Sequence, residues 1–276
     1  MTSEVILLDG PMGTELERRG QKLPAPAWSA AALWEAPDLV RQIHRDYAAA
    51  GATVHTAATF RTRSRNLAHT PWAGRWDELA RMAVSLCREG AGPQALVAGS
   101  LSTLEDCFRP DLVPDDATLA DEHEALAHVL AEAGCDLLLV ETMNTLREMR
   151  AATIAAVGTG RPVWAAVTLG AEGDYFDSKE IAQAYVEASE LGAEAFLINC
   201  TAPHRIGPAL ETLNPLISSA RLGAYGNHIF PGETKVMPDS YAQDAMKWIA
   251  HGASIIGGCC GTTPDHIAAI SALLQK

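Results

Sequence analysis

Long apolar runs, aromatic residues and positive charges are all scarce in this chain of 276 residues. No run of about 18 consecutive apolar residues occurs, so we expect no transmembrane helix. Lysine and arginine number 21 against 34 aspartates and glutamates, and the net charge of −13 argues against a nucleic-acid or anionic-membrane surface. Apolar residues still make up 48% of the chain, which is an ordinary composition for a globular protein with a large core.

Signals for export and for binding nucleotide phosphates are missing as well. The opening segment MTSEVILLDG lacks the basic leader of a signal peptide, so we expect a cytoplasmic protein. No Rossmann or P-loop glycine pattern is found. The six cysteines are expected to be reduced in that compartment. Cys87 and Cys135 lie in segments typical of core residues, whereas Cys107 lies in a polar loop that could expose its thiol.

The chain alternates short apolar runs with alanine-rich helical stretches. Runs such as LLLV are apolar on both faces, which is typical of strands in a parallel sheet that is covered on both sides. The pattern predicts eight strands, at residues 5–9, 53–59, 95–101, 136–142, 162–168, 195–201, 222–227 and 253–259.

Helix signals fill the intervals between these strands. Pro37 and Pro264 stand in a first helical turn, Thr263 is a suitable N-cap, and several stretches end in glycine. The predicted helices cover residues 36–51, 75–90, 116–134, 145–158, 177–192, 240–252 and 263–275. Eight such units predict an α/β fold, a (β/α)8 TIM barrel that forms a single domain over residues 1–276. A doubly wound open sheet is the alternative, but it rarely carries eight such regular units.

The predicted strand ends are unusually polar, and in a TIM barrel the carboxyl ends of the strands form the active site. Taken singly, each of these residues is better explained by a structural hydrogen bond. Together they predict a polar site with two carboxylates and three thiols. The residues are Asp9, Thr56, Thr59, Ser100, Glu141, Thr142, Asn199, Cys200, Thr201, Tyr225, Asn227, Cys259 and Cys260.

Three of these residues are cysteines, which is the most specific feature of the predicted site. Zinc prefers thiolate ligands, and catalytic zinc sites usually take three protein ligands and keep one open position. Neighbours on a regular strand point to opposite faces, so Cys259 and Cys260 can reach one ion only if the chain turns there, as the flanking glycines permit. On spacing alone, two core cysteines are an equally good interpretation, and a vicinal disulfide is a poor one. None of the nine histidines falls in a metal-like pair.

Five further segments span nearly the whole chain: LLDGPMGTELERRG, TFRTRSRNL, LLLVETMNTLREMRAA, INCTAP and GGCCGTTPDHI. They resemble segments of the homocysteine S-methyltransferase family and follow in the family's order. The resemblance implies a zinc ion held by Cys200, Cys259 and Cys260. It also implies homocysteine as the methyl acceptor and methionine as the product.

An acceptor of this kind carries an ammonium and a carboxylate group besides its thiol. Glu141 and Asp9 suit the ammonium, and the resemblance implies that role for acids at these positions; structural roles for both are the alternative. Asn227 resembles the family's asparagine on strand 7, although Gly226 stands where the family usually has proline. The residues expected to bind homocysteine are Asp9, Gly13, Thr14, Ser100, Glu141 and Asn227.

The methyl donor is less clearly indicated. At Trp28 the chain resembles the betaine-using branch of the family. Phe60 and Trp28 could line the donor pocket, and core packing is an equally good interpretation for each. The branch of the family that uses betaine has tyrosines where this chain has Arg61 and Thr142, and a cationic arginine is a poor neighbour for a quaternary ammonium. We therefore expect a sulfonium donor, either S-methylmethionine or S-adenosylmethionine. The arginine run 61–65 could face an anionic group of the donor or form a solvated loop.

Other functions stay open at this point. A betaine-dependent or corrinoid-dependent homocysteine methyltransferase is one alternative, and the corrinoid route would need a separate protein partner. Methyl transfer to another thiol or to a selenol is a second. A non-catalytic barrel that binds zinc or homocysteine is a third, from a different class of protein. The chain keeps all three candidate ligands and both acids, which a non-catalytic binder would not need.

Overall fold

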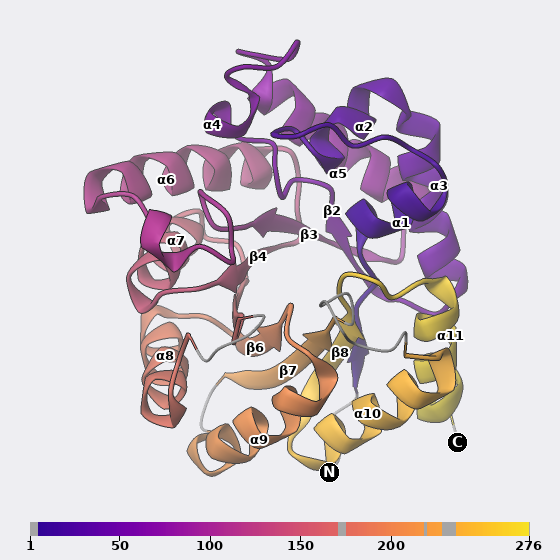
Figure 1. The fold of residues 1–276 in the computed structure, drawn as a ribbon, viewed down its shortest axis with the longest axis vertical. Helices are drawn as coiled ribbons and strands as arrows, with labels where there is room; N and C mark the ends of the chain where they lie inside the picture. The colour runs from indigo at the N-terminus through magenta and orange to yellow at the C-terminus, as the bar shows by residue number, and fades with distance from the viewer. Residues whose placement is uncertain (1–4, 171–174, 218–219, 228–235, 276) are drawn as a thin grey trace.

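The computed structural model describes residues 5–170, 175–217, 220–227 and 236–275. Eight parallel strands form one sheet in the order β1-β8-β7-β6-β5-β4-β3-β2, and a bridge between Leu8 and Val54 joins its two edges into a barrel (Figure 1). This confirms the predicted α/β barrel. The strands are β1 Ile6–Leu7, β2 Val54–Ala57, β3 Leu96–Leu101, β4 Leu137–Met143, β5 Val163–Val167, β6 Ala195–Asn199, β7 Arg221–Gly226 and β8 Ala253–Gly258.

Helices surround this barrel on the outside (Figure 1). They are α1 Met12–Arg18, α2 Ser29–Glu35, α3 Pro37–Ala49, α4 Ser64–Leu67, α5 Trp76–Ala91, α6 Asp116–Glu132, α7 Leu146–Gly158, α8 Ser178–Leu191, α9 Pro203–Leu213, α10 Pro238–Ala250 and α11 Pro264–Leu274. All seven predicted helices are present. The sequence did not predict α1, α2, α4 or α9. In α9, Pro208 lies inside the helix, and proline normally ends a helix. Within the described residues, no helix is long and apolar enough to span a membrane.

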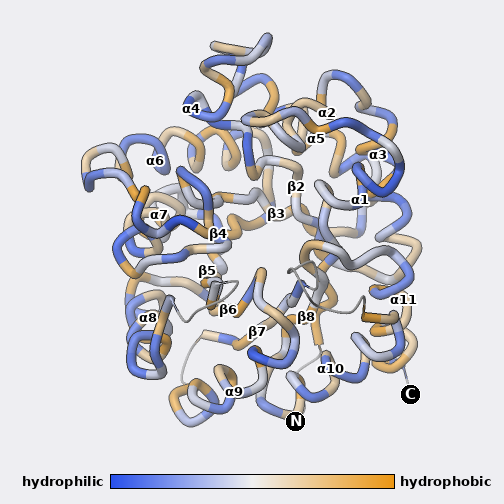
Figure 2. Tube along the Cα trace, in the orientation of Figure 1, coloured by the Kyte–Doolittle hydropathy of each residue, from blue (hydrophilic) through white to orange (hydrophobic). Residues whose placement is uncertain are grey.

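The interior of the barrel is filled with apolar side chains. Leu139, Trp164, Leu197 and Ile255 are among those that pack against one another there. A second and larger apolar cluster lies between the strands and the helices. Figure 2 shows apolar residues along the central strands and a mixture of polar and apolar residues along the helices around them. Because the barrel interior is packed, it leaves no room for a ligand, and in this fold the active site lies at the carboxyl ends of the strands.

Candidate active site

A cavity of about 650 Å³ lies at the carboxyl ends of the strands. Its walls come from segments that follow β1, β2, β3, β4, β6 and β8. Of the residues expected to bind metal, acceptor or donor, all but Asn227 line it. They are Asp9, Gly13, Thr14, Trp28, Phe60, Arg61, Ser100, Glu141, Cys200, Cys259 and Cys260.

The three cysteines meet in one wall of this cavity. The sulfur atoms of Cys200, Cys259 and Cys260 all lie within 4.8 Å of one another. Hydrogen bonds from the Cys200 thiol and then the Cys259 thiol hold the pKa of Cys260 well below its usual value. Three sulfurs at this spacing, next to an open cavity, fit the donor set that zinc prefers.

Cys200 reaches the cluster because the backbone bends just after β6. Its φ of 47° is unusual for a residue other than glycine, and such conformations cost about 1–3 kcal/mol unless their surroundings fix them. The Thr168 hydroxyl donates to the Cys200 carbonyl at 2.9 Å, and the Asn227 amide donates to the Cys200 sulfur at 3.3 Å. Asn227 therefore contacts a candidate ligand, and it is not part of the cavity wall.

The adjacent cysteines are separated by a tight turn. The amide of Thr262 donates to the Cys259 carbonyl at 3.0 Å, and Gly261 has a φ of 85°, as the third residue of a type II turn requires. Gly258 has a different role, because a Cβ atom there would lie 2.2 Å from the Thr262 hydroxyl. The Thr14 hydroxyl accepts a hydrogen bond from the Gly261 amide at 3.0 Å, so it holds the turn in place.

Glu141, at the end of β4, is held by three side chains. Its carboxylate accepts hydrogen bonds from Ser100 at 2.5 Å, from Tyr225 at 2.9 Å and from Asn199 at 3.5 Å. Burial nevertheless raises its pKa. Since the Ser100 hydroxyl proton is directed at Glu141, it is not available to a substrate carboxylate in this arrangement.

Asp9, just after β1, is only 4% exposed and has fewer donors. Its Oδ2 accepts a hydrogen bond from the Thr56 amide at 3.0 Å and lies 3.8 Å from a ring nitrogen of both His44 and His55. Burial raises the pKa of Asp9 well above its usual value. The two carboxyl groups of the cavity therefore sit in different surroundings.

Two aromatic side chains also line the cavity. Trp28 and Phe60 meet edge to face, with ring centroids 6.1 Å apart. The guanidinium of Arg61 lies 5.4 Å from the centroid of the Phe60 ring. These three residues line the cavity together with the acidic residues Glu17 and Asp106.

The three arginines of the run 61–65 have three different environments. Arg61 alone lines the cavity. Arg63 is buried and donates to the Ser102 hydroxyl and to backbone carbonyls, and burial lowers its pKa to about 10. Arg65 forms ion pairs with Glu105 and Glu122, both at 2.6 Å. The run of residues 61–65 therefore forms neither a shared anion-binding site nor a fully solvated loop.

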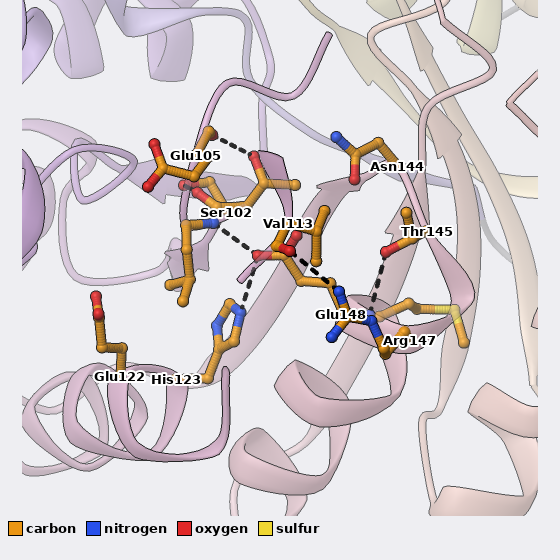
Figure 3. A network of polar contacts seen from close by, with 12 residues as sticks. Ser102, Glu105, Val113, Glu122, His123, Asn144, Thr145, Arg147 and Glu148 are labelled. Atoms are coloured by element: carbon orange, nitrogen blue, oxygen red, sulfur yellow. Dashed lines mark hydrogen bonds and ion pairs between the residues drawn. The ribbon is translucent and has the colours of Figure 1, made fainter. Parts of the chain in front are cut away.

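The loop after β3 contributes cavity residues that the sequence did not indicate. Cys107 is buried and lines the cavity, so the expectation of an exposed thiol was wrong. The loop is anchored to α7 and to the segment that precedes it. Glu148 accepts from the Leu104 amide at 2.7 Å and lies 3.3 Å from His123 (Figure 3). The Asn144 amide donates to the Cys107 carbonyl at 3.2 Å.

Known proteins are similar to this chain in sequence and in fold. A family model described as homocysteine S-methyltransferase matches residues 6–274. The homocysteine S-methyltransferase of Escherichia coli is 32% identical over 98% of this chain and 95% of its own length, and a selenocysteine methyltransferase of Astragalus bisulcatus is 28% identical over 98% and 92%. The metallated crystal structure of the E. coli homocysteine methyltransferase MmuM superposes with a TM-score of 0.84, at 28% identity over 98% and 96% of the two chains.

Proposed function

The chain belongs to the homocysteine S-methyltransferase family, and from that premise we propose that it is a zinc-dependent enzyme that methylates homocysteine from a sulfonium donor. The donor we propose is S-methylmethionine or S-adenosylmethionine, and the product is methionine. The observation that carries the proposal is the group of three cysteines in the wall of the cavity, beside two buried carboxyl groups.

Cys200, Cys259 and Cys260 are the residues that would hold the metal. Zinc in such a site supplies Lewis acidity that lowers the pKa of a bound thiol, which is otherwise mostly protonated at neutral pH. Asn227 donates to the Cys200 sulfur, and the turn at Gly261 orients the other two thiols. These contacts fix the positions of the sulfurs before any substrate arrives.

Glu141 and Asp9 are the proposed binding residues for the ammonium of homocysteine. Both line the cavity, and Glu141 is held rigidly by Ser100 and Tyr225. A fixed carboxylate reduces the freedom of the substrate and orients its sulfur, which is the main contribution a protein can make to an in-line displacement at carbon. The cavity also excludes bulk water from a developing neutral product.

The part of the cavity lined by Trp28 and Phe60 suits a cationic donor. Trp28 and Phe60 offer aromatic rings, and Glu17 and Asp106 offer negative charge, so the wall attracts a sulfonium. Arg61 can pair with the carboxylate that both proposed donors carry. In the reaction, the sulfur of homocysteine forms a bond to the methyl carbon while the bond from that carbon to the donor sulfur breaks. The donor leaves as a neutral thioether, and the thiol proton passes to solvent.

We also propose that the enzyme works in the cytoplasm. None of the six cysteines is paired in a disulfide, and three free thiols in the cavity need a reducing compartment to stay available for metal.

The proposal is tested by supplying purified, zinc-loaded protein with homocysteine and one donor at a time, and measuring methionine. We expect turnover with S-methylmethionine or S-adenosylmethionine, and little with betaine or methylcobalamin. Turnover with betaine alone would overturn the proposed donor. If none of the four donors yields methionine, the proposed activity is wrong.

A selenol acceptor is the second candidate, because one relative is a selenocysteine methyltransferase. The same assay with selenocysteine and cysteine in place of homocysteine ranks the acceptors by kcat/KM. We expect homocysteine to rank first.

A further inference from the structure

A second cluster of possible metal ligands lies directly behind the cavity wall. Asp9 follows β1, His44 lies on α3 and His55 lies on β2. One ligand atom of each lies within 4.8 Å of the other two. Both histidines are fully buried, and Asp9 is 4% exposed. The sequence spacing, in which none of the nine histidines falls in a metal-like pair, does not reveal this group, because it forms only when α3 packs His44 against His55 of β2.

Three of the four ring nitrogens in this cluster lack hydrogen-bond partners. His55 Nε2 lies 3.3 Å from the Ala52 carbonyl, and since a carbonyl only accepts, that nitrogen carries the ring proton. His55 Nδ1 therefore presents a lone pair, and it lies 3.8 Å from Asp9 Oδ2 with no partner of its own. Neither ring nitrogen of His44 has a partner. Buried polar atoms without partners are rare in native proteins and need an explanation.

Both imidazoles are in the form that binds metals. Burial lowers the pKa of His44 to about 3 and that of His55 to about 4, so both rings are neutral at neutral pH. Metal-binding histidines usually donate their other N–H to a carboxylate or a backbone carbonyl, as His55 does toward Ala52.

The space between the three atoms also matches a cation. His44 and His55 each lie 3.8 Å from Asp9 Oδ2, and their own separation is at most 4.8 Å. The in-plane point equidistant from all three atoms then lies about 2.5 Å or less from each, close to the 2.0–2.2 Å of first-row metal ligation.

We propose that Asp9, His44 and His55 form a second divalent-cation site, separate from the three cysteines. Two imidazoles and one carboxylate suit zinc, cobalt, iron or manganese in the divalent state better than the hard cations magnesium and calcium. A cation there takes one unpartnered nitrogen from each histidine and keeps Asp9 ionised.

This site has a consequence for substrate binding, and that consequence alone rests on the proposed function. Asp9 cannot fully serve both a cation and the ammonium of an amino acid. Cation binding and amino-acid binding are therefore antagonistic, and the second site is inhibitory when divalent metal is in excess.

Cobalt(II) titration of the metal-free protein tests the site without any assay of activity. We expect wild type to bind two equivalents, and Cys259→Ala/Cys260→Ala to keep one, with a spectrum that lacks sulfur-to-cobalt charge-transfer absorption. His55→Asn is expected to lose that second equivalent and keep the thiolate spectrum. His44→Gln serves as the second variant in case one histidine substitution impairs folding, and His123→Asn, a buried histidine on α6, is the matched control that keeps both equivalents.

The outcomes separate this inference from the proposed zinc site. If wild type binds one equivalent and the double cysteine variant binds none, the second site does not exist. If the double cysteine variant binds one equivalent of cobalt, and adding His55→Asn to that variant abolishes the binding, the second site exists independently of the cysteine site. Saturating methionine carries the same amino-acid group as homocysteine. We expect it to lower the affinity of wild type for the second equivalent of cobalt at least tenfold. An unchanged affinity would overturn the shared use of Asp9.

Discussion

At the scale of single residues, the two carboxyl groups of the cavity have different surroundings. Glu141 has three hydrogen-bond donors, whereas Asp9 has one backbone donor and two neutral imidazoles beside it. Burial raises the pKa of both, but donors lower the cost of ionising Glu141 and hold its oxygens in place. Glu141 is thus the better anchor for an ammonium group.

Replacement of Glu141 tests its role in binding the ammonium group of homocysteine. We expect Glu141→Gln to raise the KM for homocysteine about 10–100-fold, because a charged hydrogen bond worth about 1.5–3 kcal/mol is lost. Tyr225→Phe removes only one of the supporting hydrogen bonds, so its effect on KM should be smaller. Steady-state kinetics and zinc content check both variants. An unchanged KM in Glu141→Gln, with zinc retained, would contradict the assignment.

His44 gives a prediction on pH and stability. Its pKa is about 3 in the folded protein and near 6.5 in the unfolded chain, so the unfolded state binds more protons as pH falls. The histidine therefore makes the protein less stable below pH 6.5, by about 2 kcal/mol between pH 7 and pH 5. Urea unfolding in EDTA should show a smaller loss of stability over this range in His44→Gln than in wild type. Equal losses would show that His44 titrates normally.

At the scale of elements, the turn between β8 and α11 decides where two of the thiols point. Gly261 occupies the one position in this turn that has a φ of 85°, and Thr14 accepts a hydrogen bond from its amide. A residue with a Cβ atom is strained there, at a cost of about 1 kcal/mol or more.

A matched pair of glycine variants separates strain from function. Gly92, after α5, has a φ of 89° and open space around its Cα, and it lies far from the cavity wall. We expect Gly261→Ala and Gly92→Ala to lose similar stability, whereas only Gly261→Ala should bind zinc more weakly. Chelator competition measures the zinc affinity. Equal zinc affinities in the two variants would show that the turn does not position the thiols.

The elements themselves were largely predictable from sequence, because each depends on local signals. Strand runs apolar on both faces and helix caps such as Thr263 identified all eight strands and seven helices. Contacts between distant segments were not predictable. The burial of Cys107 depends on anchors in other segments, Asn227 turned out to face Cys200, and the cluster of Asp9 with His44 and His55 forms only when α3 packs on the barrel.

At the scale of the whole molecule, barrel closure assembles the site from residues far apart in the chain. Thr14 and Gly261 are 247 residues apart and share a hydrogen bond. The loop after β3 is held over the cavity in a similar way by Glu148 on α7. The cavity wall therefore depends on the fold being complete.

Substitution of Glu148 tests whether the protein depends on this contact between distant segments of the chain. We expect Glu148→Ala to lower the free energy of unfolding by about 2–4 kcal/mol, since it leaves the buried Leu104 amide without an acceptor. Glu148→Gln keeps an acceptor oxygen and should cost less. Urea denaturation measures both variants, and equal losses would contradict a specific role for this hydrogen bond.

We propose that Cys200, Cys259 and Cys260 would hold one zinc ion and leave a position on it for the thiol of homocysteine. X-ray absorption at the zinc edge, on protein loaded with a single equivalent of zinc, counts the sulfur ligands directly. We expect the zinc to have three sulfur ligands and one lighter ligand atom without homocysteine, and four sulfur ligands once homocysteine is bound. A count other than three in the free enzyme, or a count that homocysteine leaves unchanged, would contradict it.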